Sequence, residues 1–125
     1  MNARFSSFLL LACMIAAAGC APKADPRKPV EEVRAEAAAM NMRQLESAAR
    51  SYAKAAKARR DKLSKATEEL KKLPPKDLLS EKSRAARERA SALGTEAGEL
   101  MARHQIYVQK LGEIGGNPDK VKIPE

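Results

Sequence analysis

Apolar side chains recur at alternating spacings of three and four residues through most of the chain after residue 29. Such spacing places apolar positions on one face of a helix, and its persistence over several heptads is typical of a coiled coil. No long stretch alternates with a period of two, and β-branched residues are few. The pattern therefore predicts an all-α fold.

The first predicted helix covers residues 29–73. Pro29 suits a first helical position, and Glu31 and Glu32 follow in the first turn, where the helix dipole favours acidic side chains. Pro74 and Pro75 must end this helix, because proline lacks the backbone N–H group and restricts the residue before it.

The second predicted helix covers residues 77–114. Asp77 is a good N-cap, with Ser80 as its competitor, and Gly115 and Gly116 end the helix. Because the Pro-Pro connection is short, the two helices are expected to run antiparallel, as a long two-helix coiled-coil hairpin.

Each helix carries one mainly apolar seam, in which Arg59 is the only polar member on the first helix and Ser83 and His104 break the pattern on the second. On the first helix the seam is formed by Ala35, Ala38, Met42, Leu45, Ala49, Tyr52, Ala56, Arg59, Leu63, Ala66, Leu70 and Leu73. On the second it is formed by Leu79, Ser83, Ala86, Ala90, Leu93, Ala97, Leu100, His104, Tyr107, Leu111 and Ile114. Folding about the turn is expected to set Tyr52 near Leu100 and Leu45 near Tyr107.

A second, shorter apolar stripe lies beside these seams. Its members are Val30, Val33, Ala37 and Met40 on the first helix and Met101 and Val108 on the second. Two interpretations stay open. The stripe is either a set of scattered surface residues, which are common, or a contact surface for another copy or a partner protein.

The N-terminal residues carry a different pattern. An apolar run over residues 5–18 follows Arg4 and ends in Ala17-Ala18-Gly19-Cys20, after which the chain becomes polar. This resembles the signal peptide and lipobox of bacterial lipoproteins. The resemblance implies that the Cys20 thiol is diacylglycerylated, with palmitate as an expected acyl chain, and that the chain is cut before it. Ala21, which is not aspartate, then implies sorting to the outer membrane, facing the periplasm.

Two alternatives to lipidation remain. Residues 16–18 also form an A-x-A site, at which an ordinary secretory signal would be cut. A retained membrane span would need about 20 apolar residues, and this run is shorter. Ala17 also stands where the lipobox usually has Leu, Val or Ile. The expected organisation is a signal peptide at 1–19, a lipidated flexible tether at 20–28, the hairpin at 29–116 and a short tail at 117–125.

Positive charge is concentrated around the Pro-Pro turn. Residues 50–89 contain fourteen Lys or Arg and six Asp or Glu, whereas the rest of the chain after the signal is almost neutral. Such a cluster either keeps an alanine-rich coil soluble or contacts an anionic partner. The candidate contact residues are Lys54, Lys57, Arg60, Lys62, Lys65, Lys71, Lys72, Arg84 and Arg87.

No pattern in the sequence indicates catalysis, a metal site or a cofactor. His104 is the only histidine and falls on the apolar seam, so it is expected to be a packed or edge-exposed residue rather than a ligand. Cys13 lies in the signal peptide and acylation would consume Cys20, so no free thiol is expected. Basic residues without interleaved aromatic residues do not favour binding to nucleic acid.

The sequence thus favours a membrane-anchored lipoprotein that acts as a structural, scaffold or accessory protein of the cell envelope and is not an enzyme. Expected partners are the membrane, through lipid on Cys20, and a protein or a second copy, through the hairpin. One alternative is a module whose basic tip binds peptidoglycan or another anionic polymer. Another is a small membrane-active, toxin-like lipoprotein.

Overall fold

The computed structural model describes residues 22–125, and within them it is all-helical, as the sequence predicts. Three α-helices and two short 3-10 helices follow one another as α1 (Val30–Ala39), α2 (Met42–Lys71), η1 (Pro75–Asp77), α3 (Glu81–Glu113) and η2 (Pro118–Val121). No helix of this part of the chain is long and apolar enough to cross a bilayer.

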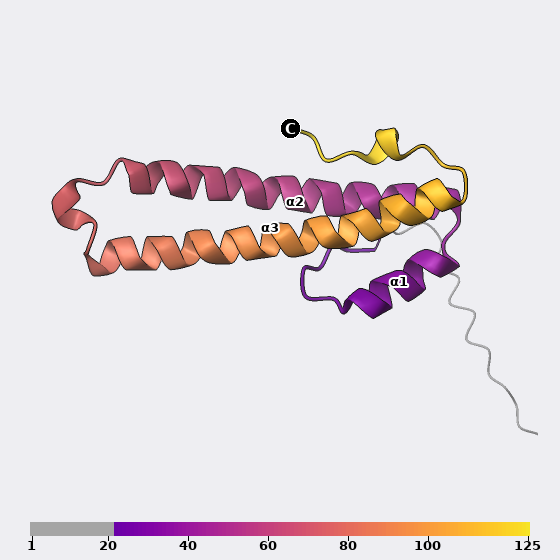
Figure 1. The fold of residues 1–125 in the computed structure, drawn as a ribbon, viewed down its shortest axis with the longest axis horizontal. Coiled ribbons are helices and arrows are strands. Elements are labelled where there is room, and N and C mark those ends of the chain that lie inside the picture. Colours follow the sequence, from indigo (N-terminus) through magenta and orange to yellow (C-terminus); the bar gives the residue numbers. More distant parts are fainter. Residues whose placement is uncertain (1–21) are drawn as a thin grey trace, which may run out of the picture.

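The two long helices, α2 and α3, pack along each other, and the chain turns back between them through residues 72–80 (Figure 1). Two contacts define how they face each other. Arg59 Nε lies 2.5 Å from Glu96 Oε2, and the ring of Tyr52 lies 5.4 Å from that of Tyr107. Tyr107 therefore packs against Tyr52, whereas the sequence placed it beside Leu45.

The helix predicted over 29–73 is interrupted at Met40 and Asn41, so that part of the prediction is wrong. Met40 is extended, and Asn41 caps α2: its side chain accepts a hydrogen bond from the Gln44 N–H at 3.0 Å. The Gln44 side chain accepts one in return from the Asn41 N–H at 2.9 Å. This reciprocal capping box satisfies two N–H groups that a helix start leaves free, and it starts α2 as a new helix.

The break lets α1 fold against α3 (Figure 1). Val33 and Ala37 of α1 are buried, and Met40 packs against the same core. The second apolar stripe is therefore largely covered within the chain itself. Of its two members on α3, Val108 also packs on this core, while Met101 stays 42% exposed.

The turn between α2 and α3 is longer than the sequence suggested. Ser80, not Asp77, caps α3, because its Oγ accepts a hydrogen bond from the Ser83 N–H at 3.2 Å while Asp77 lies in η1. The Leu78 carbonyl accepts hydrogen bonds from Ser83 Oγ and from Arg87. Leu79 lies in this turn, is 95% exposed and takes no place in the seam.

The segment before α1 is packed, contrary to the flexible tether expected at 20–28. The Pro22 carbonyl accepts a hydrogen bond from Ser51 Oγ at 3.2 Å, and the Lys28 carbonyl accepts one from Arg103 Nε at 2.8 Å. These two bonds fasten both ends of the described segment to α2 and α3. Residues 20 and 21 of the expected tether lie outside the described residues.

The C-terminal segment is also packed, contrary to the loose tail expected at 117–125. Val121 is only 1% exposed, and η2 lies against both α2 and α3. Gly115 supports the reversal that brings it there, since its φ of 85° is a conformation that glycine adopts without a steric penalty.

Burial divides α2 and α3 into two parts. In the near half (residues 42–56 and 97–113), covered by α1 and both terminal segments, the buried side chains include Leu45, Ala48, Ala49, Tyr52, Ala56, Leu100, Tyr107 and Leu111. In the far half (residues 57–96), Ser83 is the only buried residue, and Leu63, Leu70 and Leu93 are half-buried. The core is thus confined to one end.

We predict that Asn41→Ala lowers the free energy of unfolding by about 1 kcal/mol, because it removes the acceptor for the Gln44 N–H. Urea denaturation followed by circular dichroism measures this loss. Asn41→Asp keeps a side-chain acceptor and is the matched control, expected to stay near the wild type. Equal denaturation midpoints for Asn41→Ala and the wild type would contradict the assigned cap.

Candidate functional site

A groove between α2 and α3 is the main candidate site in the far half. It has a volume of about 450 Å³ and is lined by Lys62, Lys65, Ala66, Glu69, Ala85, Ala86, Arg89 and Leu93. Alanine and leucine form its apolar lining, and three cations accompany a single carboxylate. We call this set of eight residues the far groove.

The far groove brings together two of the predicted contact residues, Lys62 and Lys65. Arg89 joins them from α3 and was absent from the predicted contact set, although it belongs to the same basic stretch of sequence. These three cations make no ion pair within residues 22–125. The groove therefore carries a net positive charge that the described part of the chain leaves unneutralised.

Three other predicted contact residues are engaged within the chain. Arg87 donates hydrogen bonds to the Leu78 carbonyl and to Ser83 Oγ, and so stabilises the turn. Arg84 pairs with Glu81 on the surface of α3. Lys57 lies 3.6 Å from Asp61 and donates a hydrogen bond to the Glu125 backbone oxygen at 3.2 Å.

The remaining predicted contact residues are exposed and lie outside the far groove. Lys54 and Arg60 lie along α2, and Lys71 and Lys72 lie at its end. None of the four forms an ion pair with another residue of the described range. They make useful comparison positions, because they carry the same charge without sharing the apolar lining.

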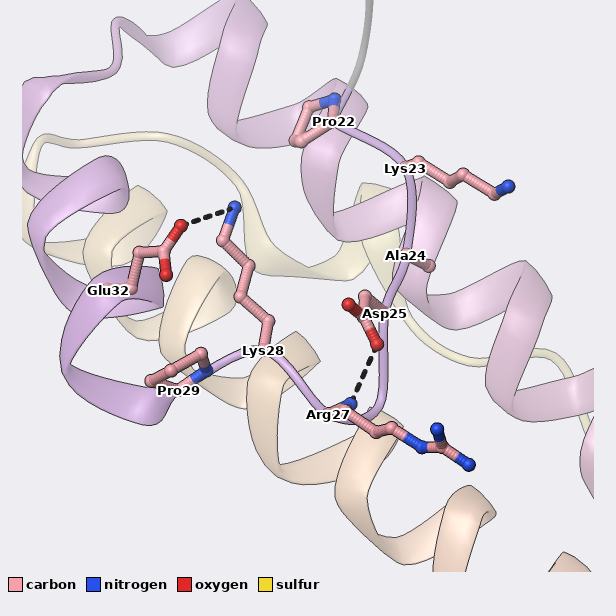
Figure 2. A pocket seen from close by; sticks show the side chains of 8 residues that line it. All are labelled: Pro22, Lys23, Ala24, Asp25, Arg27, Lys28, Pro29 and Glu32. Atoms are coloured by element: carbon pink, nitrogen blue, oxygen red, sulfur yellow. Dashed lines mark hydrogen bonds and ion pairs between the residues drawn. The ribbon is translucent and has the colours of Figure 1, made fainter.

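A second hollow lies between the N-terminal segment and α1 (Figure 2). Its volume is about 700 Å³, and its lining residues are Pro22, Lys23, Ala24, Asp25, Arg27, Lys28, Pro29 and Glu32. Lys28 extends toward Glu32, 3.6 Å away, while Lys23 and Arg27 extend away from this pair. Its central charges are thus already paired, which distinguishes it from the far groove.

A polar cluster joins α1, α2 and α3 in the near half. Tyr107 Oη donates a hydrogen bond to Glu36 Oε2 at 3.3 Å, and Lys28 Nζ pairs with the same carboxylate. The Tyr52 hydroxyl is buried and has no hydrogen-bond partner within the described residues. Through the ion pair of Lys28 with Glu36, the cluster attaches the N-terminal segment to α1, and through Tyr107 to α3.

The pKa values of Lys28 and Tyr107 in this cluster are both raised. Burial raises the pKa of Tyr107 strongly, and the nearby Tyr52 and Glu36 raise it further. For Lys28, burial acts to lower the pKa, but the hydrogen bond and negative charge of Glu36, with Glu32 and Tyr52, outweigh it. The net effect is a raised Lys28 pKa, so the ammonium form is favoured in the fold.

Cys20, the predicted lipidation site, lies outside the described residues. His104 is buried in the near half, and its Nε2 lies 2.7 Å from the Val121 carbonyl oxygen. It is therefore packed, as its seam position indicated, and it ties the C-terminal segment to α3. Among residues 22–125 no group of three His, Cys, Asp or Glu side chains is placed to hold a metal ion.

Comparisons with protein-family models, with curated proteins and with solved structures find no match to this chain.

We predict that stability falls as the pH rises above about 10, the ordinary tyrosine pKa. The raised pKa of Tyr107 means that the fold favours the neutral phenol, so its contribution is complete below pH 10 and is lost above it. Lys28 acts in the same direction, because its raised pKa favours the ammonium that alkali removes.

Urea midpoints between pH 8 and pH 11 test this dependence. Tyr107→Phe is expected to make the decline shallower, because phenylalanine cannot ionise but retains the ring that packs on Tyr52. An equally steep decline in Tyr107→Phe would show that Tyr107 does not carry the effect.

Proposed function

We propose that this protein is a lipid-anchored lipoprotein of the cell envelope and that its helices act as a scaffold or accessory interaction surface. The observation that carries the proposal is the apolar run that ends in Ala17-Ala18-Gly19-Cys20. Acyl chains on Cys20 would hold the protein at a membrane, and Ala21 favours the outer membrane, facing the periplasm. We interpret α2 and α3 as an antiparallel coiled-coil hairpin, supported by the Arg59–Glu96 and Tyr52–Tyr107 contacts.

The packed N-terminal segment supports a specific arrangement of body and anchor. Only one residue separates Cys20 from Pro22, whose carbonyl is bonded to Ser51 on α2. Two residues of extended chain reach about 7 Å, so an acylated Cys20 would keep this flank of α2 close to the bilayer. We therefore favour a body held against the membrane over a rod on a long tether.

The same arrangement leaves the far groove available to a partner. Lys65 follows Ser51 by fourteen residues on α2, which corresponds to roughly 21 Å along the helix axis. The lipid is sufficient for attachment, since each buried methylene contributes about 0.8 kcal/mol. Lys62, Lys65 and Arg89, which form no ion pair within residues 22–125, can then contact another molecule.

The proposal predicts that Cys20→Ala abolishes labelling by radioactive palmitate and moves the protein from the membrane fraction to the soluble fraction. Cys13→Ala is the matched control, since it removes the other cysteine but leaves the lipobox intact, and labelling should persist. Unchanged labelling and fractionation of Cys20→Ala would refute the anchor.

A further inference from the structure

We propose that the far groove binds an acidic amphipathic helix of a partner protein. This inference names the partner class for the interaction role proposed above and rests on that role for its location at the membrane. Three features support it: the uneven burial along α2 and α3, the apolar lining of the groove and its positive charge.

The near half shows how this helix pair completes its core. There α1 lies against α3, and its Val33 and Ala37 are buried in the same core as Leu45 and Leu111, so a third helix contributes to the core. The far half repeats the seam, but no third helix from residues 22–125 packs on it. Leu63, Leu70 and Leu93 consequently stay half-buried, although leucine is a residue that cores normally bury. Of these three, Leu93 lines the far groove, and a helix bound in the groove would bury it further.

The lining of the groove specifies what that helix carries. Ala66, Ala86 and Leu93 offer small and apolar contacts, which an apolar stripe at i, i+3, i+4 and i+7 would cover. Burial of apolar surface provides affinity that a purely polar ligand cannot obtain from such a lining. A hydrophilic polymer such as peptidoglycan has carboxylates but no apolar stripe, so the apolar lining of the groove would remain exposed to water.

The charge of the groove specifies the flanks of the helix. Lys62, Lys65 and Arg89 surround the apolar lining, with Glu69 as the one acidic member, so Asp or Glu beside the stripe complements them. A symmetric contact between the far halves of two copies is disfavoured, because residues 50–89 contain fourteen basic and six acidic residues and like charges would face each other.

The test uses the purified full chain in a neutral detergent and a defined probe. The probe is a fluorescent 18-residue helical peptide with leucine at i, i+3, i+4 and i+7 and glutamate on its flanks, and binding is measured by anisotropy. The triple variant K62E/K65E/R89E should weaken binding about tenfold or more, and it should gain affinity for the same peptide with lysine flanks.

A matched triple variant separates the groove from general charge attraction. K54E/R60E/K72E changes the net charge equally at exposed positions outside the groove, and its affinity should stay within about threefold of the wild type. Ala85→Gln adds bulk to the lining without changing charge and should also weaken binding. Circular dichroism checks that each variant is folded. If K62E/K65E/R89E is unfolded, the single variant Arg89→Glu is tested with the lysine-flanked peptide in its place.

Four outcomes would overturn the proposal. The first is an equal loss of peptide affinity in the two triple variants, and the second is equal affinity for a scrambled peptide of the same composition. The third is binding of purified peptidoglycan, in place of the peptide, that K62E/K65E/R89E weakens. The fourth is dimerisation in sedimentation experiments that the same variant abolishes. Peptide binding does not require the lipid, whereas palmitate labelling reports only on Cys20. Failure of the groove and failure of the anchor are thus distinguishable.

Discussion

Small side chains along the seam between α2 and α3 are the constraint that shapes this fold. Alanine at positions such as Ala49 and Ala56 allows the two backbones to approach closely, but it buries little apolar surface for each residue ordered. Two helices with this seam therefore need further chain segments packed against them to bury enough apolar surface for a stable core. In the near half α1 and the two terminal segments supply them, around the packed rings of Tyr52 and Tyr107.

The helical class and the end of the first helical stretch before Pro74 could be predicted from the sequence, because periodicity and proline act locally. The break at Asn41 was missed because apolar spacing continues across it from Ala38 to Met42 and Leu45. Periodicity reports which side chains share a face, but it does not report a change in chain direction. The Asn41 and Gln44 capping box was the available signal.

The terminal segments could not be predicted because their contacts are distant in sequence. Arg103 reaches the Lys28 carbonyl across 75 residues, and His104 reaches the Val121 carbonyl. Neither bond leaves a local pattern. For the candidate site, the density of positive charge in the sequence pointed to Lys62 and Lys65. Placing Arg89 beside them requires the register of α3 relative to α2, which depends on the length of the turn. The buried side chains therefore concentrate in the near half, and the leucines of the far half stay half-buried.

Native-state hydrogen exchange of the backbone amides tests this division most directly. We expect slow exchange, limited by global unfolding, in the near half, and much faster exchange through local opening in residues 60–70 and 84–95 of the far half. Uniform protection along the whole of α2 and α3 would contradict it, because the far half would then be as well packed as the near half.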